Sequence, residues 1–165
     1  DEIEETIGAA LEAYRAGDVA LAKEELDYAA TLLGQLKAES LAGFLPEPLP
    51  GWTREEGDTS RGMAGFGGGM AASAVYEREG AGIEIQLMAE NQIVASMGMM
   101  LQNPAMMGAM GTVKRIGRQM VLVTPEGDVQ AMVGPSVLVQ ISGDGAVEDK
   151  LAYLEAMDLE ALKAF

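Results

Sequence analysis

Four short stretches of alternating apolar residues follow one another near the end of the chain, and they limit the fold more than any other feature. The stretches are residues 112–116, 119–124, 129–133 and 137–142. Gly117-Arg118, Pro125–Asp128 and Gly134-Pro135 separate them with residues typical of turns. Because such short connections leave no room for a crossover, neighbouring strands must be antiparallel. The sequence therefore predicts a run of four antiparallel strands.

Further strands are predicted before residue 90. Val75–Arg78 and Ile83–Met88 alternate in polarity around a turn at Glu79–Gly82, which is the pattern of a β-hairpin. Gly51–Arg54 carries the only tryptophan and predicts a first strand at a sheet edge. Together these stretches predict one antiparallel sheet of six to seven strands.

The hydrophobic period changes from that of a strand to that of a helix at Asn91. Apolar residues then recur at helical spacing: Ile93, Met97, Met100 and Leu101. Asn103-Pro104 predicts the end of this helix and leaves residues 105–111 as a loop rich in Met and Gly. We expect the helix to be the crossover that joins the two groups of strands and covers a sheet face.

Helices are also predicted at both ends of the chain. The first two have apolar stripes at Ile3, Ile7, Ala10, Leu11 and Tyr14, and at Ala22, Leu26, Ala29, Leu33 and Leu36. Gly17 can end the first helix and Asp18 can cap the second, which predicts an antiparallel hairpin. A C-terminal helix from Val147 should pack on the sheet, with a last turn capped by Asp158. We therefore predict an α+β fold.

The proline-rich segment from Leu45 to Pro50 gives the best domain boundary, because three prolines in five positions cannot continue a helix. It separates an acidic helical hairpin over residues 1–45 from a sheet domain over residues 46–165. Gly-rich residues 57–72 lack the Lys-Ser/Thr of a phosphate-binding loop, and we expect an irregular surface loop there.

Three resemblances accompany these features. The Gly17-Asp18 turn between helices that carry Ala22 and Ala29 resembles the inner turn of a tetratricopeptide unit. It occurs once, whereas a solenoid stacks three or more repeats. The order of elements is similar to that of PsbP-like α/β/α sandwiches. The LPEPLPGW element, with the hairpin and the closing helix, resembles exported bacterial α+β proteins of uncharacterised function. These resemblances imply a fold but identify no chemistry.

Charge and composition exclude several functions. The net charge is −15, and residues 1–60 carry fourteen Asp/Glu against four Lys/Arg. Since such a surface repels phosphate, we expect no nucleic-acid partner. No apolar run is long enough to span a bilayer. The chain has no Cys and no His, which excludes thiolate catalysis and removes the usual base near neutral pH. We expect no cofactor and a non-catalytic binding or protein-interaction module; an enzyme of unrecognised type is one alternative.

The methionines supply the candidate site residues. Six of twelve lie between Met97 and Met110, and a ligand or partner surface is predicted at Met97, Met100, Met106, Met107 and Met110. Flexible thioethers fill irregular cores and also tolerate varied apolar partners. The M-x-x-M spacing of Met97–Met100 and Met107–Met110 also suits Cu(I), so the other alternative is a periplasmic Cu(I)-binding protein.

The first residue of the sequence bears on the expected location of the protein. The chain begins at Asp1 without an initiator Met, which a cleaved export signal and a trimmed chain explain equally well. We favour export, and hence a periplasmic or secreted protein. We expect a homodimer, or binding of another protein, through the hairpin or the Met-rich segment.

Overall fold

The computed structural model describes residues 1–56 and 69–165. Residues 57–68 of the loop expected over residues 57–72 therefore lie outside the described residues. Residues 70–72 belong to a strand, so the prediction of a loop is wrong there. By its internal contacts the chain divides into two compact units, residues 1–39 and residues 40–165; the predicted boundary lay between residues 45 and 46. The predicted α+β fold, with a helical hairpin before an antiparallel sheet, is confirmed.

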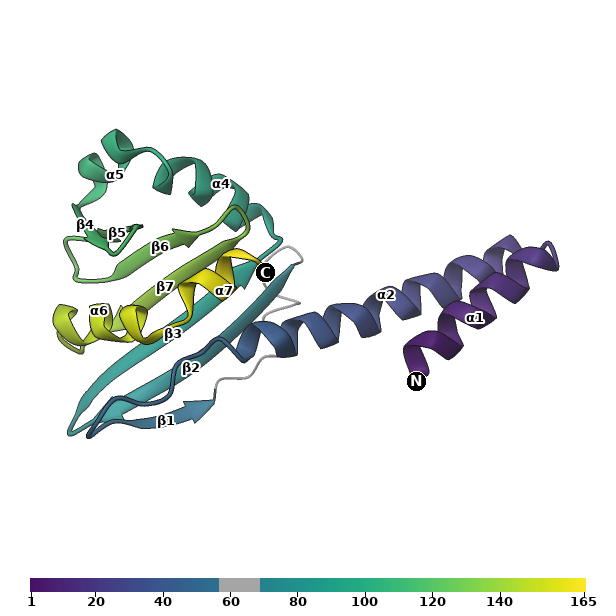
Figure 1. The fold of residues 1–165 in the computed structure, drawn as a ribbon, viewed down its shortest axis with the longest axis horizontal. Coiled ribbons are helices and arrows are strands. Elements are labelled where there is room, and N and C mark those ends of the chain that lie inside the picture. The colour runs from purple at the N-terminus through teal and green to yellow at the C-terminus, as the bar shows by residue number, and fades with distance from the viewer. Residues whose placement is uncertain (57–68) are drawn as a thin grey trace. The chain divides into compact units, whose positions relative to one another are not determined.

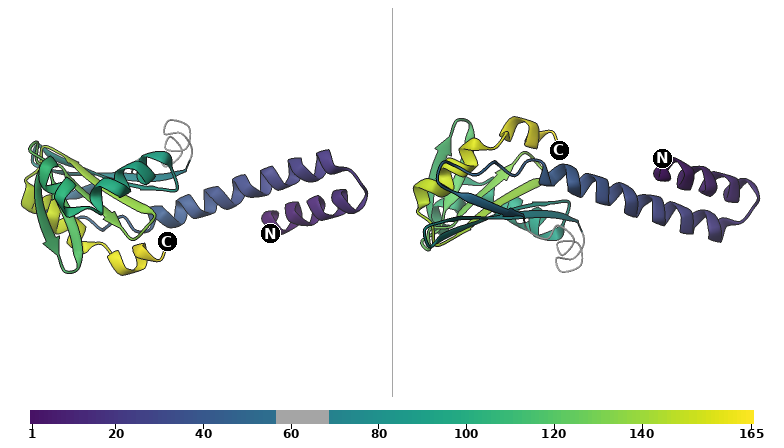
Figure 2. Two further views of the ribbon diagram at one scale, coloured as in Figure 1. Left: turned by 90° about the horizontal axis from the view of Figure 1, so that it is seen from above. Right: turned by 90° about the horizontal axis from the view of Figure 1, so that it is seen from below.

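The first unit is the antiparallel helical hairpin. Helix α1 (Glu2–Arg15) runs beside the early part of α2 (Val19–Ala42) in both views of Figure 2. Gly17 follows α1 with φ +86°, a conformation that glycine adopts at little cost, as the sequence predicted. The Asp18 carboxylate accepts the Leu21 N–H at 3.0 Å, so it caps α2 as expected. The turn chemistry thus sets the hairpin.

The second unit is built on one seven-stranded sheet. Its strands are β1 (Thr53–Glu56), β2 (Met70–Arg78), β3 (Ala81–Ala89), β4 (Thr112–Ile116), β5 (Gln119–Val123), β6 (Val129–Val133) and β7 (Val137–Gly143). They lie in the order β1-β2-β3-β7-β6-β5-β4, and each pair is antiparallel (Figure 1). The predicted four-strand run is confirmed. The pairing of β3 with β7 joins it to the earlier strands.

Two helices cross from β3 to the far edge of the sheet, where β4 lies (Figure 1). Helix α4 (Gln92–Leu101) begins where the sequence predicted, with the Asn91 side chain accepting the Val94 N–H at 2.8 Å. The predicted loop over residues 105–111 is wrong, because α5 (Pro104–Met110) forms there. Asn103 caps α5 by accepting the Ala105 N–H, and proline is well suited to the first helical position. Asn103-Pro104 therefore ends one helix and begins another.

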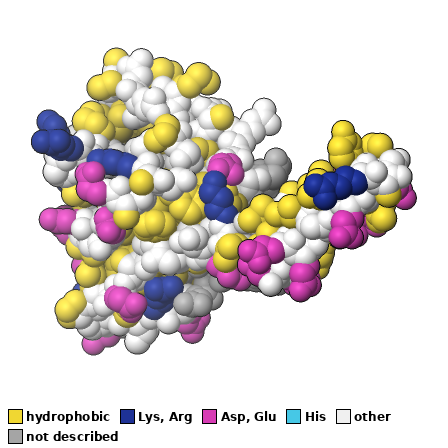
Figure 3. Space-filling view, turned by 45° about the vertical axis from the view of Figure 1, so that its right-hand side comes forward, with side chains coloured by type: hydrophobic (Ala, Val, Ile, Leu, Met, Phe, Trp, Pro, Cys, Tyr) yellow, Lys and Arg dark blue, Asp and Glu magenta, His cyan; other side chains and the backbone are white. Residues whose placement is uncertain are grey.

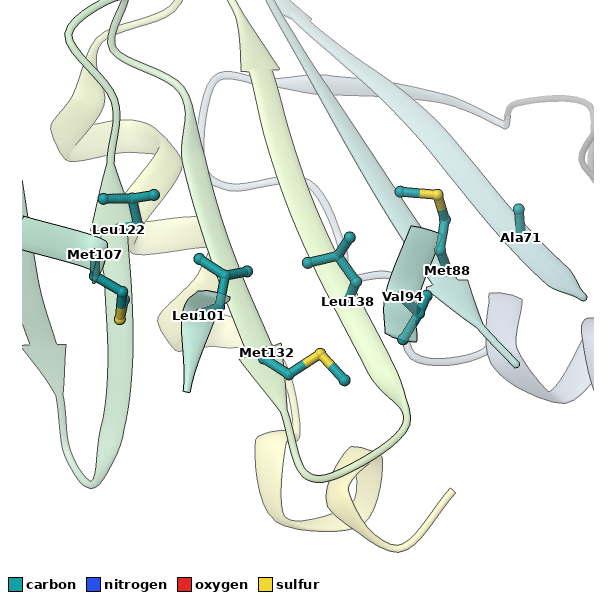
Figure 4. Packing of buried hydrophobic residues seen from close by; sticks show 8 residues of the cluster. All are labelled: Ala71, Met88, Val94, Leu101, Met107, Leu122, Met132 and Leu138. Carbon is teal, nitrogen blue, oxygen red and sulfur yellow. The ribbon is translucent and has the colours of Figure 1, made fainter. Parts of the chain in front are cut away.

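The crossover helices bury one face of the sheet, as predicted. Eight buried residues form the contact: Ala71, Met88, Val94, Leu101, Met107, Leu122, Met132 and Leu138. Figure 4 shows side chains of β2, β3, β7, β6 and β5 in a row beneath the side chains of α4 and α5. Ala71, Met88, Leu138 and Met132 are cross-strand partners in one row of the register, which places them on the same face. Packing thus accounts for much of the Met-rich segment.

The opposite face is covered by α6 (Val147–Ala156) and α7 (Leu159–Lys163), the predicted C-terminal helix and last turn. The ring of Tyr153 on α6 lies 4.4 Å from that of Tyr76 on β2, measured between centroids. Lys150 is 1% exposed, and its ammonium donates to the carbonyls of Gly127 and Gly143 at 2.8 and 2.7 Å. This buried lysine ties α6 to the β5–β6 turn and to the end of β7.

The proline-rich segment is held to the same face by tyrosine hydroxyls. Tyr76 donates to the Pro46 carbonyl at 2.6 Å, and the Tyr153 hydroxyl accepts the Leu49 N–H at 3.2 Å. Trp52 lies edge-on to Tyr153, and the Arg78 guanidinium stacks 4.6 Å from the Trp52 ring centroid. The tryptophan therefore anchors the chain where it enters β1, as expected from its position.

The packing predicts different costs for two methionines of the crossover. Met107 is 1% exposed and Met99 is 74% exposed. Met107→Ala removes buried thioether and methylene groups and leaves a cavity, so we expect it to lower the free energy of unfolding by about 2–4 kcal/mol. The control Met99→Ala should change it by less than about 0.5 kcal/mol. Denaturant unfolding of both variants measures this, and equal losses would show that Met107 is not in the core.

The tyrosine cluster predicts a loss of stability in alkali. Burial raises the pKa of Tyr76 to about 12, although Arg54 acts in the opposite direction. In an unfolded chain the pKa of tyrosine is near 10. The free energy that burial of neutral Tyr76 contributes to folding is therefore fully present below pH 10 and is lost as the pH rises towards 12. We expect unfolding experiments to show this fall and Tyr76→Phe to reduce its slope. Burial also raises the pKa of Tyr153, so this residue should account for the pH dependence that is left in the Tyr76→Phe variant. An unchanged slope in Tyr76→Phe would contradict the assignment.

Candidate interaction surfaces

The five predicted methionines do not form one surface. Met107 is in the core, and Met97 and Met110 pack against the same cluster while partly buried. Met100 is half-buried, whereas Met106 is 45% exposed. Within this segment the most exposed methionine is Met99, which is not one of the five predicted surface residues. The segment chiefly covers the sheet, and only single methionines reach solvent.

Acidic side chains near the C-terminal helix have protein partners. Asp144 accepts the Gly82 N–H at 2.6 Å, and Asp149 forms an ion pair with Arg78 at 3.1 Å. In residues 1–56 and 69–165, no three His, Cys, Asp or Glu side chains are grouped closely enough to hold a metal ion. Thioethers are a different class of ligand, and Cu(I) binding stays a prediction.

Two of the hollows on the described surface of the sheet unit are lined largely by polar side chains. The smaller, of about 150 Å³, lies over β3, β7 and β6 beside the buried cluster. The register aligns Gln86, Gln140 and Gln130 across its floor, and Gln130 Oε1 is buried with no hydrogen-bond partner among the described residues. Glu84 and Asp128 flank the row of glutamines. A serine nucleophile needs a hydrogen-bonded base, and Ser142 has none in the described part of the chain. This hollow is a polar surface of the sheet.

The larger hollow, of about 370 Å³, lies between the β4–β5 turn and the C-terminal helices. Its lining includes the charged side chains of Arg118, Glu155, Asp158, Glu160 and Lys163. Lys163 already donates to Glu160 at 2.9 Å, and the Asp158 carboxylate accepts the Ala161 N–H as the cap of α7. Asp158, Glu160 and Lys163 thus make these contacts within helix α7 and its cap.

The helical hairpin carries most of the exposed apolar side chains. Among the described residues eleven large apolar side chains are exposed, and nine of them belong to residues 1–39. They are Ile7, Leu11, Tyr14, Val19, Leu21, Leu26, Tyr28, Leu33 and Leu36. The described part of the sheet unit contributes Met99 and Met106. An apolar surface so concentrated on one small unit is typical of a contact site.

Helical spacing assigns these side chains to the two sides of the hairpin. Small buried residues mark the line along which the helices meet: Ala10, Ala13, Ala22 and Ala29. The Tyr28 hydroxyl donates to Glu2 Oε1 at 2.8 Å, so both side chains lie on one side of that line. At 3.6 residues per turn, six exposed side chains fall on the other side. This hairpin apolar face consists of Ile7, Leu11, Tyr14, Val19, Leu26 and Leu33.

Charges surround the face unevenly. Residues 1–39 carry ten Asp/Glu and three Lys/Arg. Figure 3 shows apolar side chains along one side of the hairpin and acidic side chains gathered on another. Lys23 forms an ion pair with Asp27 on the same helix. The hairpin is therefore amphipathic, with an apolar face on an acidic body.

The sequence argument predicted the apolar stripes but not which half of each would stay exposed. It grouped Ala22 and Ala29 with Leu26 and Leu33, yet the two alanines are buried against α1 while the leucines are about half exposed. The size of the side chains could have distinguished the buried residues from the exposed ones. Small residues allow the two helices to approach closely, which leaves the larger side chains at the side of the helix interface.

Comparisons with family models, with curated proteins and with solved structures found no match for this chain. None of the helices in the described ranges is both long enough and apolar enough to cross a bilayer.

The copper hypothesis has a direct test in this geometry. Met107 is fully engaged in the core and Met97 and Met110 are partly so, which leaves few thioethers free to meet around one ion. We expect Cu(I), added under reducing conditions, to leave the midpoint of thermal unfolding unchanged. A ligand that binds only the native state must raise that midpoint. A rise that is absent from Met97→Leu would favour the copper-binding alternative.

Proposed function

We propose that this protein is a non-catalytic protein-interaction module whose contact surface is the hairpin apolar face. The observation that carries the proposal is the distribution of exposed apolar side chains. Of the eleven large ones among the described residues, nine lie in residues 1–39. Burying a large aliphatic side chain gains about 1.5–3 kcal/mol, so a unit that leaves this many in water has a strong tendency to cover them.

The internal packing of the hairpin supports the same function. The buried line between its helices is made of Thr6 and alanines, which provide little apolar area. A two-helix unit with so small an interface gains most of its stability from an additional layer. The side chains able to form that layer are the large ones on the hairpin apolar face.

Site-specific photo-crosslinking in the cells that produce the protein tests this proposal. A photoreactive phenylalanine derivative replaces Tyr14, which is 67% exposed on the face and already aromatic. The control places the same group at Glu12, which is exposed on the side of α1 away from the face. Irradiation followed by detection of this chain on a denaturing gel reveals any adduct.

We expect an adduct of defined mass from position 14 and none from position 12. An adduct that forms equally at both positions would indicate non-specific contact. No adduct from position 14, with the protein folded by circular dichroism, would remove the hairpin apolar face as a contact surface and with it the proposed function.

A further inference from the structure

We infer that the partner of the hairpin apolar face is a second copy of this chain. This rests on the proposed function, and it adds the identity of the partner and the register of the contact. Two hairpins would meet face to face about a two-fold axis that lies in the contact plane and runs across the helices. Helix α1 then packs antiparallel to the second copy's α1, and α2 to the second copy's α2.

The charges of α1 are self-complementary in that arrangement. Glu4 and Arg15 are eleven residues apart, which is close to three helical turns, so both lie on the same side of α1 at opposite ends. Both are exposed at the edge of the face, and neither side chain has an ion-pair partner in the part of the chain that the structure describes. An antiparallel pairing of two α1 helices brings Glu4 opposite the second copy's Arg15, twice.

The apolar residues follow the same symmetry. Ile7 and Leu11 lie on either side of the midpoint between Glu4 and Arg15. In the antiparallel pairing, Ile7 therefore faces the second copy's Leu11, and Leu11 faces the second copy's Ile7. On α2, Val19 and Leu33 are each seven residues from Leu26. The same axis therefore sets Leu26 against the second copy's Leu26, and Val19 against Leu33. One isologous contact satisfies both helices.

The size of the face also fits a homodimer. Its six side chains are between 45% and 67% exposed. A fully exposed aliphatic side chain presents roughly 60–120 Å² of apolar area and an aromatic one more, so six half-exposed side chains offer on the order of 300–400 Å². A standard interface takes about 800 Å² from each partner, and the polar edge can supply the difference. An anionic membrane is a poorer occupant, because the acidic residues of the hairpin would be repelled by it.

Charge reversal tests this register on the full chain by sedimentation equilibrium, from about 1 μM to about 1 mM. We expect the wild-type protein to form a dimer. Arg15→Glu sets like charges against each other at both ends of α1 and should raise the dissociation constant about tenfold. Glu4→Arg should do the same. The double variant Glu4→Arg/Arg15→Glu restores opposite charges across the contact and should recover the wild-type dissociation constant to within about threefold.

Two controls separate the contact from effects inside one helix. Glu4 and Arg15 also lie where the α1 dipole favours their charges, so each reversal weakens α1 itself, and the double variant does so most. A loss caused only by helix weakening would therefore be greatest in the double variant, which is the opposite of rescue. Glu12→Arg, on the side of α1 away from the face, should leave the dissociation constant unchanged. Leu26→Glu, at the axis, should raise it at least 100-fold.

Three outcomes would overturn the inference: a wild-type monomer at every concentration, a dimer insensitive to Leu26→Glu, or a double variant weaker than both single variants. The failure of the inference is distinct from that of the proposed function. A monomer in solution whose position-14 crosslink joins a different protein leaves the function standing with another partner. A monomer that gives no adduct removes both.

Discussion

The pairing of β3 with β7 is the constraint on which the sheet unit depends. It places the last strand of the C-terminal run beside the hairpin of β2 and β3, so the chain must leave β3 and reach β4 at the opposite edge before the run can begin. A connection of that length must pass over a sheet face. The residues that make it therefore need apolar side chains on the side that meets the sheet.

This requirement explains the methionines better than chemistry does. Val94, Leu101 and Met107 lie at the contact with the sheet, and Met88 and Met132 meet them from β3 and β6. A Cβ atom added to Gly98 would lie 3.4 Å from the Met132 methyl group, so α4 approaches β6 closely. Unbranched thioethers adapt to the irregular space between two short helices and a twisted sheet. The Met-rich segment thus chiefly covers the sheet, and the proposed contact surface lies in the acidic hairpin.

Local signals in the sequence predicted most of the elements. Turn residues located the hairpins, and the change of period at Asn91 located α4, since each depends on neighbours in sequence. The β3–β7 pairing was not predictable, because it joins residues 83–89 to residues 137–143 and leaves no local pattern. Helix α5 was missed although Asn103-Pro104 is also a start signal. The early part of β2 was missed because Ala71 and Ala72 give no alternation in polarity.

The candidate surface was predictable only in part. The stripes on α1 and α2 indicated a hairpin, but which apolar residues would meet inside it depends on how closely the helices approach. Ala10 and Ala22 set that approach, and Leu11 and Leu26 are left on the flank as a result. The account therefore assigns packing to the Met-rich crossover and association to the hairpin.

Hydrogen–deuterium exchange of the full chain at low and high protein concentration tests that division most directly. Association slows the local opening of the segments it covers, whereas a buried crossover exchanges at a rate set by its own unit. The account predicts slower exchange at high concentration in α1 and α2, with the amides of residues 92–110 unchanged. Slower exchange in residues 92–110, with α1 and α2 unchanged, would contradict it.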